Sequence, residues 1–164
     1  MTAPTGIRLR LRPLLTTDRR RIEEISRLVG LFREAEIQVA LEVFDAAVIP
    51  DQTDYHTLAA EVDGALMGWI CWGETPCTEG TWDLYWIAVD PAAHGMGVGT
   101  ALVHEMEQRL AGQARLIVIE TSGRPDYRPT EAFYLARGYR AVARVPDFYA
   151  PGDDQVIYVK PLAP

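Results

Sequence analysis

The residues most diagnostic of the fold are Leu84-Tyr85-Trp86-Ile87-Ala88-Val89-Asp90-Pro91-Ala92-Ala93-His94-Gly95-Met96-Gly97-Val98-Gly99-Thr100-Ala101-Leu102. An apolar run that ends at Val89 predicts a buried strand, and apolar residues at helical spacing predict a helix from about Gly97 to Gly112. Three glycines at alternate positions open that helix, and glycine lets a backbone approach a ligand closely. A helix N-terminus adds unpaired N–H groups and a partial positive charge. The stretch therefore predicts a site for phosphate or pyrophosphate.

Two other phosphate-binding motifs fit this stretch poorly. A P-loop ends in Gly-Lys-Ser or Gly-Lys-Thr, and neither follows these glycines. A dinucleotide fingerprint needs GxGxxG directly after the strand, but the third glycine position holds Thr100 or Leu102, depending on where counting begins. Glu120 does stand near the place of the acid that binds a ribose. An oxidoreductase that uses NAD(P) is therefore an alternative that the glycine spacing disfavours.

The remaining patterns predict a mixed α/β sheet. The Asp63-Gly64 pair is a hairpin signal, so the early strands should be antiparallel, and the central strand–helix–strand unit should be a parallel crossover. We expect strands at residues 7–12, 57–62, 66–72, 82–89, 116–119, 139–145 and 156–160, and helices at about residues 16–30, 33–48, 97–112 and 129–137. The fold class is thus α/β, with a largely antiparallel central sheet of about seven strands flanked by about four helices, in a single domain over residues 1–164.

Composition narrows the class of protein. The formal net charge of -7 argues against a nucleic-acid binder, which needs a basic face to displace counterions. The two cysteines, Cys71 and Cys77, form no metal motif and no disulfide framework. No apolar run approaches the ~20 residues of a membrane helix, and the N-terminus lacks the apolar core of a signal peptide. We expect a cytoplasmic protein without a metal, a nucleic-acid partner or a membrane span.

The glycine stretch, with Ile87–Pro91 before His94–Leu102, resembles motif A of the GNAT acyltransferases. In that motif Arg/Gln-x-x-Gly-x-Gly/Ala follows an apolar strand that ends in Val-Asp-Pro. Phe133-Tyr134 followed by Gly138-Tyr139 is similar to the family's motif B, aromatic-Tyr-x-x-x-Gly-aromatic. The order of elements over the whole chain also matches, so the resemblance implies a GNAT-type sheet.

The resemblance implies acetyl-CoA as the acyl donor. Backbone N–H groups of residues 96–100 would hold its pyrophosphate, and its pantetheine arm would run beside strand 82–89, where an N–H near Val89 would polarise the thioester carbonyl. The family usually has Arg or Gln at the position of His94, and many members have Asn at the position of Tyr127. The implied cofactor-binding residues are Ile87, Ala88, Val89, His94, Gly95, Met96, Gly97, Val98, Gly99, Thr100 and Tyr127.

Acyl transfer to an amine needs a base, because an alkylammonium with a pKa of ~10 is charged at neutral pH, and it needs an acid for the leaving thiolate. The resemblance assigns the acid to Tyr134. Asp83 is one candidate base, because it stands where some GNAT enzymes carry Glu. Glu120 is the other, because it ends an apolar strand at the edge where α/β sites gather, although an ion pair with Arg124 or Arg128 would also explain it. A chain of water molecules that uses neither carboxylate directly stays open.

We therefore expect an N-acetyltransferase that moves the acetyl group of acetyl-CoA to a primary amine, by direct attack in a ternary complex. Its acceptor is expected to be a small molecule. The alternative is a catalytically silent module of the same fold that binds or senses acyl-CoA. Dimers are common in the resembled family, so a homodimer is open.

Overall fold

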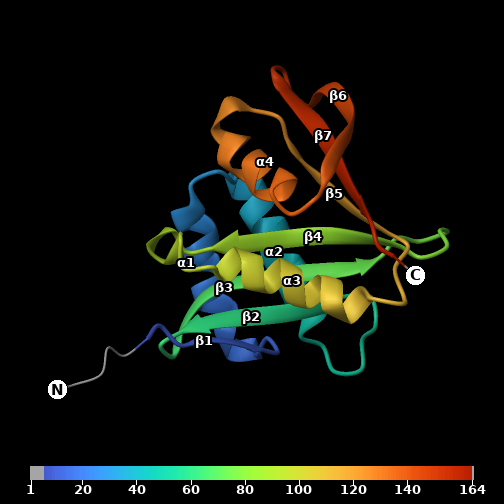
Figure 1. The fold of residues 1–164 in the computed structure, drawn as a ribbon. Helices are drawn as coiled ribbons and strands as arrows, with labels where there is room; N and C mark the ends of the chain where they lie inside the picture. The colour runs from blue at the N-terminus through green and yellow to red at the C-terminus, as the bar shows by residue number, and fades with distance from the viewer. Residues whose placement is uncertain (1–5, 164) are drawn as a thin grey trace. The chain divides into compact units, whose positions relative to one another are not determined.

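The computed structural model describes residues 6–163 (Figure 1). Within them, seven strands form one mixed sheet in the order β1-β2-β3-β4-β5-β7-β6, accompanied by four α-helices. The elements are β1 (Leu9–Arg12), η1 (Thr16–Asp18), α1 (Arg19–Val29), α2 (Glu34–Ala47), β2 (His56–Val62), β3 (Ala65–Glu74), β4 (Thr81–Val89), η2 (Pro91–Ala93), α3 (Val98–Leu110), β5 (Leu116–Ser122), η3 (Pro125–Tyr127), α4 (Arg128–Leu135), β6 (Arg140–Ala150) and β7 (Asp153–Pro161). The predicted fold class is confirmed.

Several strands run further than their apolar residues predicted. The predicted strand at residues 116–119 ends at Ser122 in the structure, because antiparallel pairing with β7 continues from Leu116↔Pro161 to Ser122↔Gln155. Backbone hydrogen bonding needs no apolar side chain, so the end of an apolar run does not mark the end of pairing. The Asp63-Gly64 hairpin is confirmed, with φ of 51° and 86°, as a two-residue turn of type I′ requires.

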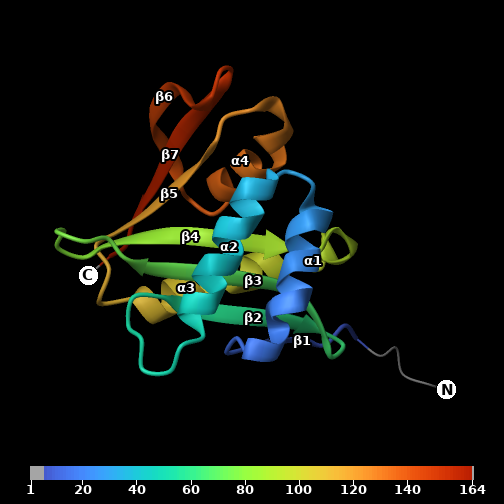
Figure 2. The same cartoon turned by 180° about the vertical axis from the view of Figure 1, so that it is seen from behind.

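The chain divides into two compact units, and each is described by itself. The first comprises residues 6–71 and 86–108. Its helices α1 and α2 cover one face of β2 and β3, and α3 covers the other (Figures 1 and 2). Between α1, α2 and the strands lies a core that includes Ile22, Ile25, Phe44 and Trp69, with the Phe44 and Trp69 rings 6.3 Å apart in an edge arrangement.

The second unit comprises residues 72–85 and 109–163. The start of β4 pairs in parallel with β5, and β5, β7 and β6 follow as antiparallel neighbours. Helix α4 packs on this part of the sheet through Tyr134, whose ring lies 5.8 Å from that of Tyr139 and 5.8 Å from that of Tyr158. Since ring pairs at this separation attract one another, the aromatic cluster fixes α4 on β7.

Strand β6 is irregular. Ala141 pairs with Tyr158 and Ala143 with Ile157, so Val142 is an extra residue, and the pairing is interrupted again between Val145 and Ala150. A β-bulge bends a strand and re-aims its side chains.

No helix in the part of the chain that the structure describes is long and apolar enough to cross a lipid bilayer.

Candidate active site

The predicted anion site is a turn of backbone in the first unit. After β4, η2 leads into residues 94–97, and the turn is closed by hydrogen bonds from His94 N to Pro91 O (3.1 Å) and from Met96 N to Ala93 O (3.2 Å). Gly95 and Gly97 have φ of 77° and 80°, where other residues are strained, and a Cβ on either would meet nothing within 4 Å. These glycines are therefore needed for conformation, and the space beside them is open.

The open space is lined by backbone donors. Among the described residues, no backbone carbonyl accepts from the N–H groups of Gly97, Val98 or Gly99, and Ala101 N bonds to Gly97 O at 2.9 Å. Three adjacent donors at the positive end of a 13-residue helix favour an anion. The N–H of Met96, predicted to belong to this set, is already bonded to Ala93 O. The turn at residues 94–97 is exposed throughout, so a ligand can reach it.

Two contacts hold the helix start in place. Gly68 of β3 is so close to it that a Cβ would lie 3.0 Å from Val98 Cγ1 and 3.1 Å from Ala88 O. Asp90 caps η2 by accepting from Ala92 N (2.8 Å), donates its own N–H to Met67 O (2.7 Å), and is paired with Arg21 of α1. Burial alone would raise the pKa of Asp90, but the Ala92 N–H and the Arg21 guanidinium together hold it below its usual value.

The predicted acid, Tyr134, lies in the second unit. Its side chain is 3% exposed, and its hydroxyl has no hydrogen-bond partner among residues 6–163. Burial, and then the neighbouring Tyr127 and Tyr158, raise the pKa of Tyr134 well above its usual value. The hydroxyl is therefore protonated at neutral pH and is chemically a proton donor.

Tyr127, the predicted pantetheine contact, is buried and lies at the junction of η3 and α4. The guanidinium carbon of Arg124 is 5.2 Å from the centre of its ring, which is cation–π distance. Tyr127 thus helps to fix the start of α4.

The two candidate bases share one face of the sheet, and it is not the face of Tyr134. Asp83 pairs in register with Val118, and residues paired across strands point the same way, so Asp83, Val118 and Glu120 share a face. Tyr158 pairs with Ile119, so it lies on the opposite face, where Tyr134 packs against it. Within the second unit, the acid and either base are therefore separated by the sheet.

Each candidate base already has one neutral partner. Asp83 accepts a hydrogen bond from Thr75 Oγ1 at 2.7 Å. Glu120 is exposed and accepts from Gln155 Nε2 at 3.0 Å. The alternative of an ion pair with Arg124 or Arg128 is wrong, because Arg124 pairs with Asp126 and Asp153, and Arg128 has no ion pair in the described chain. Both carboxylates keep lone pairs that could accept a proton or hold a water molecule.

Across residues 6–163, no three His, Cys, Asp or Glu side chains gather in an arrangement that could hold a metal ion.

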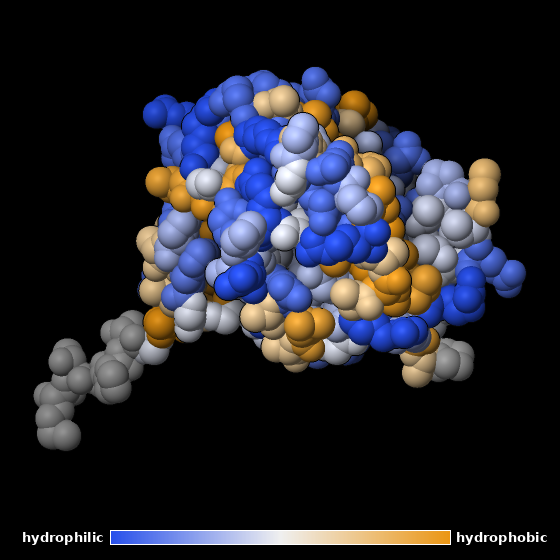
Figure 3. Space-filling model, turned by 90° about the horizontal axis from the view of Figure 1, so that it is seen from above, coloured by the Kyte–Doolittle hydropathy of each residue, from blue (hydrophilic) through white to orange (hydrophobic). Residues whose placement is uncertain are grey.

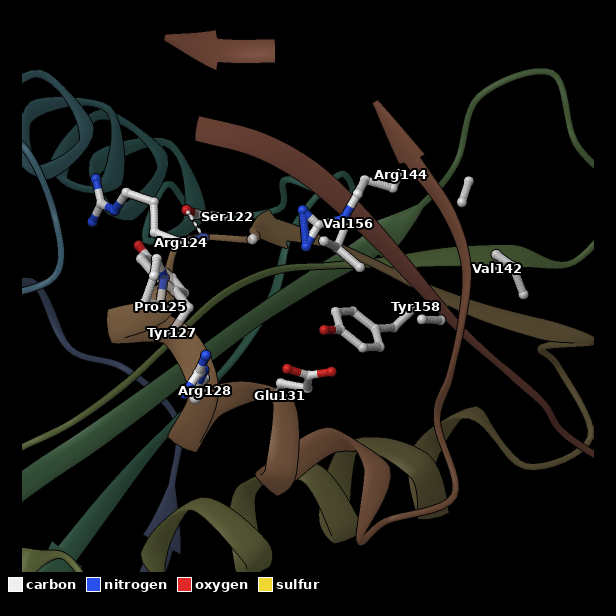
Figure 4. A pocket seen from close by; sticks show the side chains of 13 residues that line it. Ser122, Arg124, Pro125, Tyr127, Arg128, Glu131, Val142, Arg144, Val156 and Tyr158 are labelled. Carbon is white, nitrogen blue, oxygen red and sulfur yellow. Dashed lines mark hydrogen bonds between the residues drawn. The ribbon is translucent and has the colours of Figure 1, made fainter. Parts of the chain in front are cut away.

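A pocket that no sequence motif predicts lies in the second unit, between the η3–α4 segment and strands β6 and β7 (Figure 4). Its volume is about 470 Å³. Its walls come from chain segments that are far apart in the sequence, and no motif links them, so only the folded sheet brings them together.

Comparison with known proteins places the chain in a family. The model of the acetyltransferase (GNAT) family matches residues 23–139, a span that includes the glycine turn and Tyr134. A GNAT-family protein from Desulfovibrio desulfuricans has a structure with a TM-score of 0.89 and 36% sequence identity, covering 95% of this chain and 100% of that one. This chain belongs to the GNAT acetyltransferase family.

Two further similarities are more distant. An L-2,4-diaminobutyric acid acetyltransferase from Nocardia farcinica is 31% identical over 108 residues, 59% of this chain. The aligned region spans 55% of the length of this Nocardia farcinica protein and 63% of the length of a second curated relative. A protein from Salmonella typhimurium, solved with acetyl-CoA, shares the fold at 17% identity and a TM-score of 0.72, with 94% of each chain covered.

Proposed function

We propose that this protein transfers the acetyl group of acetyl-CoA to the primary amine of a small-molecule acceptor. The observation that carries the proposal is the row of three unpartnered N–H groups, on Gly97, Val98 and Gly99, at the start of α3 in a chain of the GNAT family. A pyrophosphate has enough negatively charged oxygens to accept from all three.

We propose the cofactor contacts that the sequence predicts, which begin on β4. The edge of Ile87, Ala88 and Val89 would bind the pantetheine arm, and His94, Gly95, Met96 and Thr100 would surround the pyrophosphate. Tyr127 is the further residue proposed to contact the arm. The Salmonella typhimurium relative of the same fold was solved with acetyl-CoA, which supports this choice of donor.

In the proposed reaction, the amine nitrogen attacks the thioester carbonyl carbon, an N–C bond forms, and the C–S bond breaks. A backbone N–H near Val89 would stabilise the oxyanion, and Tyr134 would protonate the leaving sulfur. Asp83 or Glu120, directly or through water, would accept the proton that the ammonium group loses before attack. The second proton, which the nitrogen loses as the amide forms, would return through water to Tyr134 and restore its hydroxyl. Because Tyr134 and the two carboxylates lie on opposite faces of the sheet, the proposed acid and the proposed base are different side chains that would act from different sides.

The choice of a small amine as acceptor rests on the relative from Nocardia farcinica, whose name specifies an amino-acid substrate with a side-chain amine. We further propose that both units belong to one acyltransferase domain, since the family match runs across both of them. A cytoplasmic location is proposed as well. A homodimer would use β6, the edge strand of the sheet, whose residues 140–148 are exposed.

The proposal is tested by turnover. The protein is incubated with acetyl-CoA and a panel of amines, free thiol is measured, and acetylated products are identified by mass spectrometry. Thiol release that depends on one class of amine, with a product heavier by one acetyl group, supports the proposal. Tight acetyl-CoA binding with no amine-dependent release would favour the silent acyl-CoA-binding module.

A further inference from the structure

The pocket of the second unit contains a hydroxyl without a partner. Tyr158 of β7 is 3% exposed, and its hydroxyl makes no hydrogen bond with any residue that the structure describes. Figure 4 shows this hydroxyl directed toward the side of the pocket that carries Arg128 and Glu131. The hydroxyl faces the open pocket, so a ligand there would replace solvent with a direct hydrogen bond.

The charges around the pocket divide into two groups. Arg144 is neutralised by Asp154 (2.6 Å), and Arg124 by Asp126 (3.1 Å) and Asp153 (3.5 Å). Arg128 and Glu131, in contrast, form no ion pair within residues 6–163. The uncompensated charges of the pocket are thus one cation and one anion.

Arg128 and Glu131 are three residues apart on α4, so their Cβ atoms are about 5–6 Å apart on one side of the helix. Such pairs often form ion pairs, but these two side chains do not. Glu131 and Tyr158 both line the pocket and lie on the same side of it in Figure 4. Burial, and then the charge of Glu131, raise the pKa of the Tyr158 hydroxyl. A carboxylate, a hydroxyl and a guanidinium therefore line one side of the pocket.

The opposite wall is shaped by two special features of the chain. Ala141, Val142 and Ala143 form the β-bulge of β6 and line the pocket, and bulges are over-represented beside functional sites. Gly123 leaves room for Arg144, since a Cβ there would lie 2.9 Å from both of its terminal nitrogens. A side chain at residue 123 would therefore push Arg144 out of its place in the wall.

We propose that this pocket binds a small zwitterion, a free α-amino acid. Its carboxylate would pair with Arg128, its ammonium group would bind Glu131 and the Tyr158 hydroxyl, and its side chain would lie against Val142 and Val156. Its two charged groups are separated by a single carbon, which suits a cation and an anion one helical turn apart. The surface over α4 and the β6–β7 hairpin is mostly hydrophilic in Figure 3, which favours a polar ligand over an apolar partner.

The test is calorimetric titration of the full chain with each of the twenty standard L-amino acids, without acetyl-CoA. The outcome is therefore independent of the proposed transferase activity. For an amino acid that binds, the matched amine without the carboxylate and the matched acid without the amine are titrated as well. We expect saturable binding by at least one amino acid, and affinity about tenfold lower or worse for both analogues, since each loses a charge-assisted contact.

Three variants locate the site: Tyr158→Phe, Glu131→Gln and Arg128→Gln. Each should lower the affinity about tenfold or more, whereas Arg140→Gln, an exposed arginine of β6 outside the pocket lining, should bind like the parent protein. Circular dichroism of each variant checks that it is folded. Absence of binding by every amino acid overturns the proposal. It is also overturned by an amine analogue that binds as tightly as its amino acid, or by variants that all bind like the parent.

Discussion

Arg21 of α1 and Asp90 at the end of β4 form a hydrogen-bonded ion pair, and this pair ties a helix to the segment that leads into the glycine turn. Arg21 also donates to Leu66 O at 3.1 Å, and Asp90 both caps η2 and bonds to Met67. The turn that presents the N–H groups of α3 is therefore held by side-chain contacts as well as by its own backbone.

Asp90→Asn should keep the cap but lose the ion pair. We expect a loss of about 2 kcal/mol in the free energy of unfolding at pH 7, the typical value of a hydrogen bond to a charged group. The pKa of Asp90 is lower in the folded state, so its contribution is complete above the ordinary Asp pKa of ~3.9 and is lost as pH falls through the folded value.

The difference between the parent protein and Asp90→Asn should accordingly shrink toward zero as pH falls below ~4 in urea unfolding experiments. Asp51→Asn, in an exposed turn, is the control and should change little at any pH. A difference between parent and variant that stays constant down to low pH would show that the charge of Asp90 does not matter.

Tyr134→Phe removes the proposed acid and keeps its ring. We expect kcat to fall about 100-fold or more, the usual range for loss of general acid catalysis, with acetyl-CoA affinity nearly unchanged. Because burial raises the pKa of Tyr134, its ionisation should not cause a loss of activity between pH 7 and ~9 in the parent. Tyr139→Phe, in the same aromatic cluster, is the control, and an equal loss in both variants would point to packing instead.

Asp83→Asn and Glu120→Gln distinguish the candidate bases. The base must lose its proton before the amine can attack, so its removal should abolish the acidic limb of the kcat/KM profile and lower activity about 100-fold. We expect this for one of the two variants and near-normal activity for the other. If both keep the acidic limb of the parent, water alone relays the proton.

The two cysteines should differ sharply in reactivity. Burial raises the pKa of Cys71 to about 12, whereas Cys77 is exposed. Iodoacetamide at a pH of about 7.5 should therefore modify Cys77 alone, as measured by peptide mass spectrometry. Cys71→Ala should keep its activity, because direct attack needs no acylated cysteine, and loss of transfer in a folded Cys71→Ala protein would argue against the direct mechanism.

The glycine turn was predictable from sequence because its signals are local. Gly95, Gly97 and the strand that ends at Val89 are close neighbours in the chain, and their meaning depends only on backbone geometry. The fold class followed from periodicity for the same reason. The predicted contact of the Met96 N–H with the pyrophosphate stays a prediction, and the structure adds that this N–H bonds to Ala93 O within the turn.

The second unit was less predictable because its relationships are long-range. That Glu120 and Tyr134 lie on opposite faces follows from the pairing of β5 with β7. These two strands are far apart in the sequence, and their apolar patterns do not show that they are neighbours in the sheet. In the sequence Tyr158 is one more residue of a closing strand. Its unpartnered hydroxyl gains meaning only once α4 and the β6 bulge surround it.

Every role proposed for the first unit depends on acetyl-CoA binding at the N-terminus of α3, and Gly97→Ala tests that binding. Gly97 has φ of 80°, and Gly112, just beyond the other end of α3, has φ of 76°; a Cβ on either would meet nothing within 4 Å. Gly97→Ala and Gly112→Ala should thus share a backbone strain of about 1–2 kcal/mol. Only the first alters the proposed site.

The parent and both variants are titrated calorimetrically with acetyl-CoA, with NAD and ATP as control ligands. We expect selective, saturable binding of acetyl-CoA by the parent and by Gly112→Ala, and an affinity at least about tenfold lower for Gly97→Ala. Equal affinity in all three proteins, or no binding of acetyl-CoA to the parent, would show that the N-terminus of α3 is not the site.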